Sequence, residues 1–114
     1  MLSKENRLKK KSDFDFVFSK GRGFGGDFLF LKTVKNNLKI SRFGFVVSKK
    51  VSNKAVIRNK IKRRMSEVVR SNLIKIKEGM DVVIIANKAI KEKDFSTIKE
   101  REESLFQRSG LIKK

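Results

Sequence analysis

The chain has 114 residues, of which 39% are hydrophobic, and this length and composition suit one domain with a modest core. Its 30 Lys and Arg against 12 Asp and Glu give a formal net charge of +18, which attracts phosphate-rich partners and favours a nucleic-acid-binding role. The absence of Cys and His excludes disulfides, thiolate and imidazole metal sites and a histidine general base, and no apolar run approaches the ~20 residues of a membrane span.

The basic residues 1–11 predict an N-terminal arm ahead of the first helix. Ser12 followed by Asp15 is typical of a capping box, which starts a helix over residues 12–20. One face of this helix is apolar and contains Phe14, Val17 and Phe18. We expect Gly21 to end the helix in a left-handed conformation.

Two strands are predicted next. Residues 21–26 are Gly-rich and predict a flexible loop; because they precede a strand and do not open a helix, they do not fit a nucleotide-phosphate loop. A dense aromatic and aliphatic run predicts a strand over 28–35, and alternating apolar residues predict another over 42–48. Asn36 and Asn37 favour a turn, so we expect the two strands to pair as a hairpin.

Residues 53–76 change to a helical period and predict a long amphipathic helix. Its apolar sector, which the core needs, contains Ile57, Ile61, Met65, Val68, Val69 and Asn72. Steps of about 100° per residue place a polar and basic sector on the opposite side, with Asn59, Lys62, Arg63, Ser66 and Arg70.

The last two elements are a strand and a helix. The unbroken apolar run 82–86 predicts a central strand covered on both faces. Asp94 or Thr97 can cap a final helix that ends at Gly110. The buried side of this helix is expected to include Phe95, Ile98, Leu105 and Phe106.

The order of the elements predicts the fold class. A helix, strands, a long helix, a strand and a helix indicate an α+β sandwich with a small sheet and helices mainly on one side. We expect a single RNA-binding domain over residues 1–114, with the basic arm (1–11) and a short C-terminal tail (110–114) at its ends.

The highest density of positive charge lies between Lys49 and Arg70. These 22 residues contain nine Lys or Arg against a single acid, Glu67. A helix face that only keeps a protein soluble usually mixes both signs, whereas this one repels itself until a polyanion binds. The segment therefore predicts an RNA-binding surface, whose candidate contacts are Lys49, Lys50, Lys54, Arg58, Asn59, Lys60, Lys62, Arg63 and Arg70.

Two segments carry a family resemblance. Residues 58–63 (RNKIKR), preceded by 47–51 (VSKKV) and by Ala55-Val56, resemble the signature segment of the bacterial ribonuclease P protein subunit. Residues 7–10 (RLKK) are similar to that family's N-terminal stretch, and they are followed at matching spacing by Phe14, Val17, Phe18 and Gly21. Length and element order also agree, so the resemblance covers almost the whole chain.

The resemblance implies a fold and a function. The fold would contain a four-stranded sheet and three helices, like the second domain of ribosomal protein S5, with an unusual left-handed βαβ crossover. The protein would join the ribonuclease P catalytic RNA and help it remove the 5′ leader from precursor tRNA. Mg²⁺ bound mainly by the RNA would carry the chemistry, the protein alone would not be catalytic, and no obligate protein partner is implied.

The family's binding residues carry over to the positions of this chain that match its motifs. The expected contacts to the catalytic RNA are Arg58, Asn59, Lys60, Lys62 and Arg63. The leader would lie in a cleft between the first helix and the sheet, where Phe14 and Phe18 offer ring edges for stacking and Ser48 offers a contact at a strand end. A Phe pair at this spacing equally suits a core anchor, and Ser48 equally suits a polar turn.

The chain departs from the family pattern at two positions. The family usually has Arg three positions after the matched Arg63, where this chain has Ser66. We expect one phosphate contact to be lost there or supplied by Arg70. The family often has an aromatic residue at one position of its first long strand. This chain has Leu31 at that position, which removes a stacking ring.

Three other functions fit parts of the sequence. A general basic ribosomal or RNA-chaperone protein would bind many structured RNAs, and a DNA-binding module would read the major groove with the long helix. A peripheral membrane protein needs a free apolar face, whereas the apolar sector here is needed for the core.

Acid pairs such as Asp13 with Asp15, or Glu102 with Glu103, suit helix caps or solvated faces better than metal sites. We expect a cytoplasmic protein that binds no membrane and holds no metal of its own.

Overall fold

The computed structural model describes residues 2–112, so the first residue of the predicted arm and the last two of the predicted tail lie outside it. Three short 3₁₀ turns, η1 (Lys4–Asn6), η2 (Leu73–Lys75) and η3 (Lys88–Glu92), accompany the main elements. In chain order the helices and strands are α1 (Lys11–Lys20), β1 (Arg22–Gly25), β2 (Leu29–Lys35), β3 (Arg42–Val47), α2 (Ala55–Asn72), β4 (Met80–Ala86) and α3 (Phe95–Arg108).

The described strands form one mixed four-stranded sheet in the order β1-β2-β4-β3. β1 pairs with β2, and β2 with β4, in antiparallel fashion, while β3 and β4 are parallel. The predicted hairpin between the strands now seen as β2 and β3 is wrong, because β4 lies between them. β4 carries the 82–86 run, which is apolar on both faces and therefore occupies a central position with a partner on either side.

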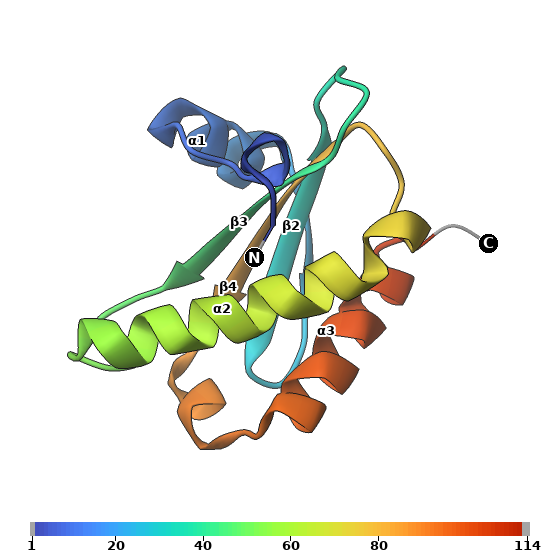
Figure 1. Ribbon diagram of the computed structural model, residues 1–114. Helices are drawn as coiled ribbons and strands as arrows, with labels where there is room; N and C mark the ends of the chain where they lie inside the picture. The colour runs from blue at the N-terminus through green and yellow to red at the C-terminus, as the bar shows by residue number, and fades with distance from the viewer. Residues whose placement is uncertain (1, 113–114) are drawn as a thin grey trace.

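The connection from β3 through α2 to β4 is a crossover between neighbouring parallel strands. In Figure 1, α2 lies in front of the sheet, both strands run downward, and β3 lies to the left of β4. The chain therefore turns in the left-handed sense, opposite to nearly all βαβ units. This handedness was implied by the family resemblance and not by any residue pattern.

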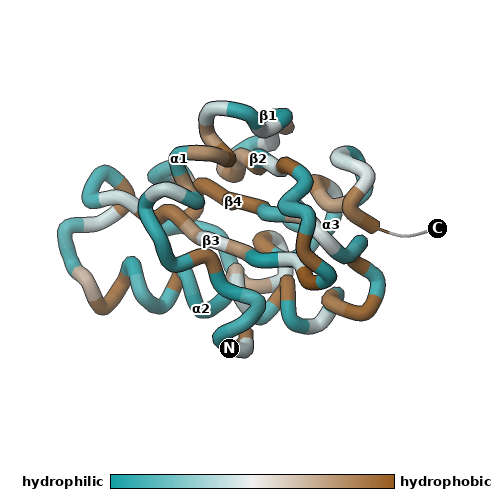
Figure 2. Tube along the Cα trace, turned by 90° about the horizontal axis from the view of Figure 1, so that it is seen from above, coloured by the Kyte–Doolittle hydropathy of each residue, from teal (hydrophilic) through white to brown (hydrophobic). Residues whose placement is uncertain are grey.

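Helices cover the two sheet faces unequally. α2 and α3 share one face, where the main core includes Leu31, Phe43, Met65, Val68, Ile84, Ile98, Leu105 and Phe106. On the other face, α1 covers a small cluster of Leu8, Val17 and Val83. Figure 2 shows hydrophobic β4 enclosed between these layers. The predicted α+β architecture with helices mainly on one side is confirmed.

The Gly-rich stretch predicted as a flexible loop instead contains the edge strand β1. Its residues pair with β2 from Arg22 opposite Thr33 to Gly25 opposite Phe30. The Phe30 ring lies across this strand, and a Cβ built on Gly23 would come within 2.7 Å of it. The glycines therefore make room for an aromatic ring, which is a role that composition alone does not distinguish from flexibility.

The ends of the helices differ from the prediction in detail. α1 begins at Lys11 after an N-cap at Lys10 that makes no side-chain cap, so Ser12 lies inside the first turn and forms no capping box. Gly21 ends α1 in an extended conformation with φ of −75°, not a left-handed one. α3 is capped by Asp94, whose carboxylate accepts a hydrogen bond of 2.8 Å from the Thr97 N–H.

Both ends of the described chain are packed. In the arm, Leu2 and Leu8 are buried. In the predicted tail, Leu111 is buried and its carbonyl accepts a hydrogen bond from the Lys77 N–H, while Ile112 forms a bridge with Ile76. These contacts make residues 111–112 part of the core layer of α2 and α3.

Candidate nucleic-acid interface

The apolar side of α2 fixes which of its polar residues face solvent. Ile61, Met65, Val68 and Val69 are buried against the sheet and α3. The opposite side carries exposed Asn59, Lys60, Arg63 and Arg70, which we call the α2 ridge. Among the other predicted contacts, Lys49, Lys50 and Lys54 are exposed before the helix, whereas Arg58 and Lys62 are half-buried beside the ridge.

Arg58 has a structural function in addition to its charge. Its Nη1 donates hydrogen bonds of 3.0 Å to the carbonyls of both Ser52 and Asn53. The same turn is closed by the Lys54 N–H, which donates to the Ser52 hydroxyl at 3.2 Å. Arg58 thereby holds the basic turn at 49–54 against the first turn of α2, so that both present their cations together.

Ser66 does not lie in the exposed basic sector where the helical wheel placed it. Its exposed fraction is 2%, because α2 packs against both β3 and α3 and its buried arc is wide. A helical wheel gives the direction of each residue but not the width of the covered arc. The position at which we expected a phosphate contact to be lost is therefore buried in this chain.

Arg70 lies on the ridge but is paired. Its Nε and Nη2 donate hydrogen bonds to Glu67 Oε2 at 3.2 and 2.9 Å, and these bonds lower the pKa of Glu67. Because the ion pair is exposed, water and salt screen it, and a phosphate can compete with Glu67 for the guanidinium.

The second predicted surface lies beside α1, on the opposite sheet face. The Phe14 ring packs against the Leu8, Val17 and Val83 cluster, and a Cβ on Gly44 would overlap it. The half-buried Phe14 ring therefore anchors α1 to this cluster. Phe18 differs, because its ring is 38% exposed while its carbonyl accepts a hydrogen bond of 2.6 Å from Lys32 Nζ on β2.

Next to α1, part of the sheet has no helix over it, and we call this part the open sheet face. Its side chains form one row across the strands, because Phe30 and Val46 both lie opposite Ile85. Phe30 is 39% exposed, and Val46 and Ile85 are half-buried. These three residues were not predicted as a site, although strand alternation gives a signal, because it places them on the sheet face opposite the main core.

Leu31 and Ser48 can now be placed relative to this face. Leu31 is fully buried in the main core, on the other side of the sheet from its neighbour Phe30. The replacement of an aromatic residue by Leu31 thus leaves the open sheet face unchanged. Ser48 is exposed just after β3, and its hydroxyl accepts a hydrogen bond of 3.3 Å from the Lys50 N–H.

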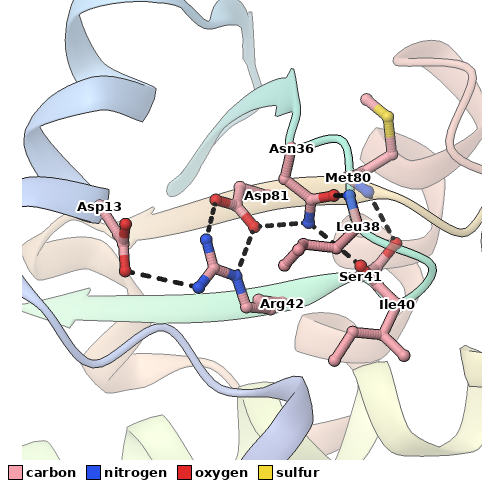
Figure 3. Close-up of polar contacts among 8 residues, drawn as sticks. All are labelled: Asp13, Asn36, Leu38, Ile40, Ser41, Arg42, Met80 and Asp81. Atoms are coloured by element: carbon pink, nitrogen blue, oxygen red, sulfur yellow. Dashed lines mark hydrogen bonds and ion pairs between the residues drawn. The ribbon is translucent and has the colours of Figure 1, made fainter.

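An ion-pair network joins α1 to the sheet (Figure 3). Arg42 of β3 donates from Nε and Nη2 to the two carboxylate oxygens of Asp81 on β4, at 2.9 and 2.7 Å. These bonds raise the pKa of Arg42. Nη1 of Arg42 also lies 3.5 Å from the carboxylate of Asp13 on α1. The network fixes the position of α1 beside the open sheet face.

No helix within residues 2–112 is both long enough and apolar enough to cross a membrane.

Comparison with known proteins shows the family of this chain. The family model for ribonuclease P matches residues 2–110. The ribonuclease P protein component of Alkaliphilus metalliredigens is 44% identical, over 99% of this chain and 96% of that protein, and that of Clostridium acetobutylicum is 40% identical, over 96% and 92%. The solved RNase P protein of Staphylococcus aureus has a TM-score of 0.88 at 29% identity, covering 94% of this chain and 97% of that one. That of Thermotoga maritima has a TM-score of 0.82 at 34% identity, covering 90% and 96%. This chain therefore belongs to the ribonuclease P protein family.

Proposed function

We propose that this protein joins a ribonuclease P RNA through the α2 ridge and the turn at 49–54, and holds the 5′ leader of precursor tRNA on the open sheet face. The observation that carries the proposal is the separation of two different surfaces by one sheet. The α2 ridge offers cations and the Asn59 amide on one side, while Phe18 and Phe30 offer rings on the other. The exposed residues 48–50 connect them at the end of β3.

The α2 ridge suits the backbone of a folded RNA. Each phosphate neutralised by Lys or Arg releases counterions and contributes about 0.9 to the salt slope on a duplex, or about 0.7 on single strands. By neutralising phosphates that would otherwise repel each other, the protein lowers the Mg²⁺ concentration at which the RNA is active. Lys60 and Arg63 are exposed and lie on the same ridge as Asn59, so they are the central contacts.

The open sheet face suits a single-stranded leader of variable sequence. Stacking of a base on an aromatic ring is worth about 1–3 kcal/mol and depends little on the base. Because mature tRNA has no leader, this term favours the precursor by about 5- to 150-fold. The same difference favours release of the product after cleavage.

The chemistry is assigned to the RNA. Within residues 2–112, no three acidic side chains come together as a metal site would need. Mg²⁺ prefers oxygen ligands such as phosphate and carboxylate, and RNA supplies the former. Metal ions held there would activate the attacking water, while this protein's residues bind and orient the two RNA partners. The protein alone is then expected to have no nuclease activity.

Reconstitution tests this proposal. The protein is combined with a bacterial ribonuclease P RNA, and cleavage of 5′-labelled precursor tRNA is measured at low Mg²⁺, beside protein-alone and RNA-alone controls. We expect cleavage at the mature 5′ end only when both components are present. Tight RNA binding without any stimulation over RNA alone would contradict the assignment and favour a general RNA chaperone.

A further inference from the structure

A hollow of about 770 Å³ lies at the edge of the sheet, and its lining includes no residue of the α2 ridge and none of Phe30, Val46 and Ile85 of the open sheet face. β1 pairs with β2 only as far as Arg22 opposite Thr33, so β2 continues through Val34 and Lys35 without a neighbour on that side. The hollow opens over this unpaired stretch. Its other wall is residues 109–111, where the chain leaves α3. We call it the edge pocket.

The wall formed by the loop between β2 and β3 is held rigidly. Asn36 Oδ1 accepts a hydrogen bond of 2.7 Å from the Leu38 N–H, and Asn36 Nδ2 donates to the Ile40 carbonyl at 3.0 Å and to Asp81 at 2.8 Å (Figure 3). Asp81 is itself fixed by Arg42. This chain of bonds shapes the edge pocket before any ligand enters, which reduces the entropic cost of binding.

The rim of the edge pocket is strongly basic. Lys20, Arg22, Lys35 and Lys77 all line it and are exposed, against one acid, Glu78. None of these four cations takes part in an ion pair within the described chain. A local excess of positive charge, with no ion pair to the four cations among the described residues, attracts an anionic group such as a phosphate.

The interior of the edge pocket is apolar. Leu38 is 47% exposed, and Met80 and Phe24, which also line the pocket, are half-buried. The guanidinium carbon of Arg22 lies over the Phe24 ring, 5.4 Å from its centre, which is a cation–π contact. Thr33, which also lines the pocket, has a buried hydroxyl with no hydrogen-bond partner in residues 2–112. A flat ring with polar edges fits this lining.

We propose that the edge pocket binds one nucleotide of a single-stranded RNA, with its phosphate among the rim cations and its base against Phe24 and Leu38. A plain anion would leave Leu38 uncovered, and an apolar ligand would leave the cations unmatched. The volume also falls within the roughly 300–1,000 Å³ of small-ligand sites. This inference rests on the proposed function only in taking RNA as the partner, and it adds a third contact to the two described above.

The position of the edge pocket suits a strand that continues from the open sheet face. Phe30 and Lys32 point to that face, and β2 leads from them to Lys35 at the pocket. The last residue of α1, Lys20, lies between the two, since it lines the pocket while Phe18 borders the open face. An RNA strand following β2 would therefore pass Lys32 and then reach Lys20 and Lys35.

The test begins with the protein alone, because the edge pocket does not require the catalytic RNA. Amide chemical shifts are followed by NMR at low salt during titration with uridine monophosphate, uridine, inorganic phosphate and a Glu-rich hexapeptide. We expect uridine monophosphate to bind at least fivefold more tightly than the other three, with the largest shifts at Thr33, Leu38 and Gly79. An oligouridine should shift the same amides at lower concentration.

Two variants remove the two halves of the site. Lys35→Gln with Lys77→Gln removes rim charge, and Leu38→Ser removes apolar surface; each should weaken uridine monophosphate and oligouridine binding at least fivefold. The matched controls are Lys91→Gln with Lys99→Gln, which lie outside the pocket, and Ile74→Ser, which also removes an exposed apolar side chain outside it. The controls should leave both affinities unchanged.

The outcomes separate this inference from the proposed function. Equal affinity for phosphate and uridine monophosphate, equal affinity for the hexapeptide, or affinities that the two variants do not change would each overturn the nucleotide site. The reconstituted cleavage assay on the unmodified protein is an independent measurement. Failure of that assay with nucleotide binding intact would contradict the proposed function and leave the edge pocket as a nucleotide site.

Discussion

Arg42 and Asp81 face each other across the parallel strands β3 and β4, and the guanidinium contacts both carboxylate oxygens. Asp81 has an exposed fraction of only 3%. Removing one partner of a buried ion pair leaves an uncompensated charge, which costs about 3–5 kcal/mol. We therefore predict that Arg42→Leu lowers the free energy of unfolding by roughly that amount in urea denaturation. Lys11→Leu removes the exposed pair with Asp15 and should cost less than about 1 kcal/mol. Equal losses in both variants would contradict a special role for Arg42.

Glu102 makes stability depend on pH. Its side chain is fully buried and both carboxylate oxygens lack a hydrogen-bond partner within the described residues, so burial, together with the nearby charge of Glu103, raises the pKa of Glu102 well above its usual range. A carboxyl whose pKa is higher in the folded state contributes stability below its unfolded pKa, and that contribution is lost as pH rises.

Replacing Glu102 should therefore stabilise the protein at neutral pH. We expect Glu102→Leu to raise the free energy of unfolding by at least about 1–3 kcal/mol at pH 7, because an unsatisfied buried polar group is removed. The gain should shrink as the pH falls toward 4. Glu100→Leu on the exposed side of α3 serves as the control, with changes within about 0.5 kcal/mol. A gain that does not vary with pH would refute the assigned titration.

The α2 ridge can be tested by salt dependence. We predict that Asn59→Ala with Arg63→Ala weakens binding to a ribonuclease P RNA and lowers the salt slope by about 1, since one phosphate-contacting cation is removed. Circular dichroism should be unchanged, because both side chains are exposed. Lys99→Ala on α3 provides a matched loss of one exposed charge. An RNA affinity as high as that of the unmodified protein would remove the α2 ridge from the interface.

Phe14 and Phe18 should give opposite results. Phe18→Ala is expected to reduce the preference of the reconstituted holoenzyme for precursor over mature tRNA by about 5- to 150-fold, with little loss of stability. Phe14→Ala removes a ring packed against the α1 cluster and should lower the unfolding free energy by on the order of 2–3 kcal/mol. Phe18→Ala is tested by the ratio of the holoenzyme's affinities for precursor and mature tRNA, and Phe14→Ala is tested by thermal melting. If Phe18→Ala leaves the affinity ratio intact, its ring does not contact the leader.

The sequence predicts local structure well where one pattern persists over many residues. α2 is an example, since 18 residues keep a helical period, and its apolar side could be predicted from that period alone. The sequence does not predict in the same way how distant segments pair in the sheet. β4 separates β2 from β3, and nothing in the short turn at Asn36 and Asn37 indicates that a strand 45 residues away will intervene.

In the candidate site, too, local properties could be predicted from the sequence and properties of the packed fold could not. Exposed ridge residues such as Arg63 were predictable, because charge and helical phase are local properties. The burial of Ser66 was not, because it depends on how much of α2 its neighbours cover. The open sheet face was also missed, although Phe30 lies next to the buried Leu31, because only the finished packing shows which sheet positions lack a helix.

The central position of β4 makes the basic helix depend on a segment synthesised after it. As the chain leaves the ribosome, α2 emerges before β4, and its apolar side then has no completed sheet to cover. A nascent chain that ends before Met80 already carries all nine cations of residues 49–70, but it lacks β4, which pairs with β3, and α3, against which α2 packs. Such a chain attracts RNA through charge alone, and a defined arrangement of contacts arises only once residues 80–86 have entered the sheet.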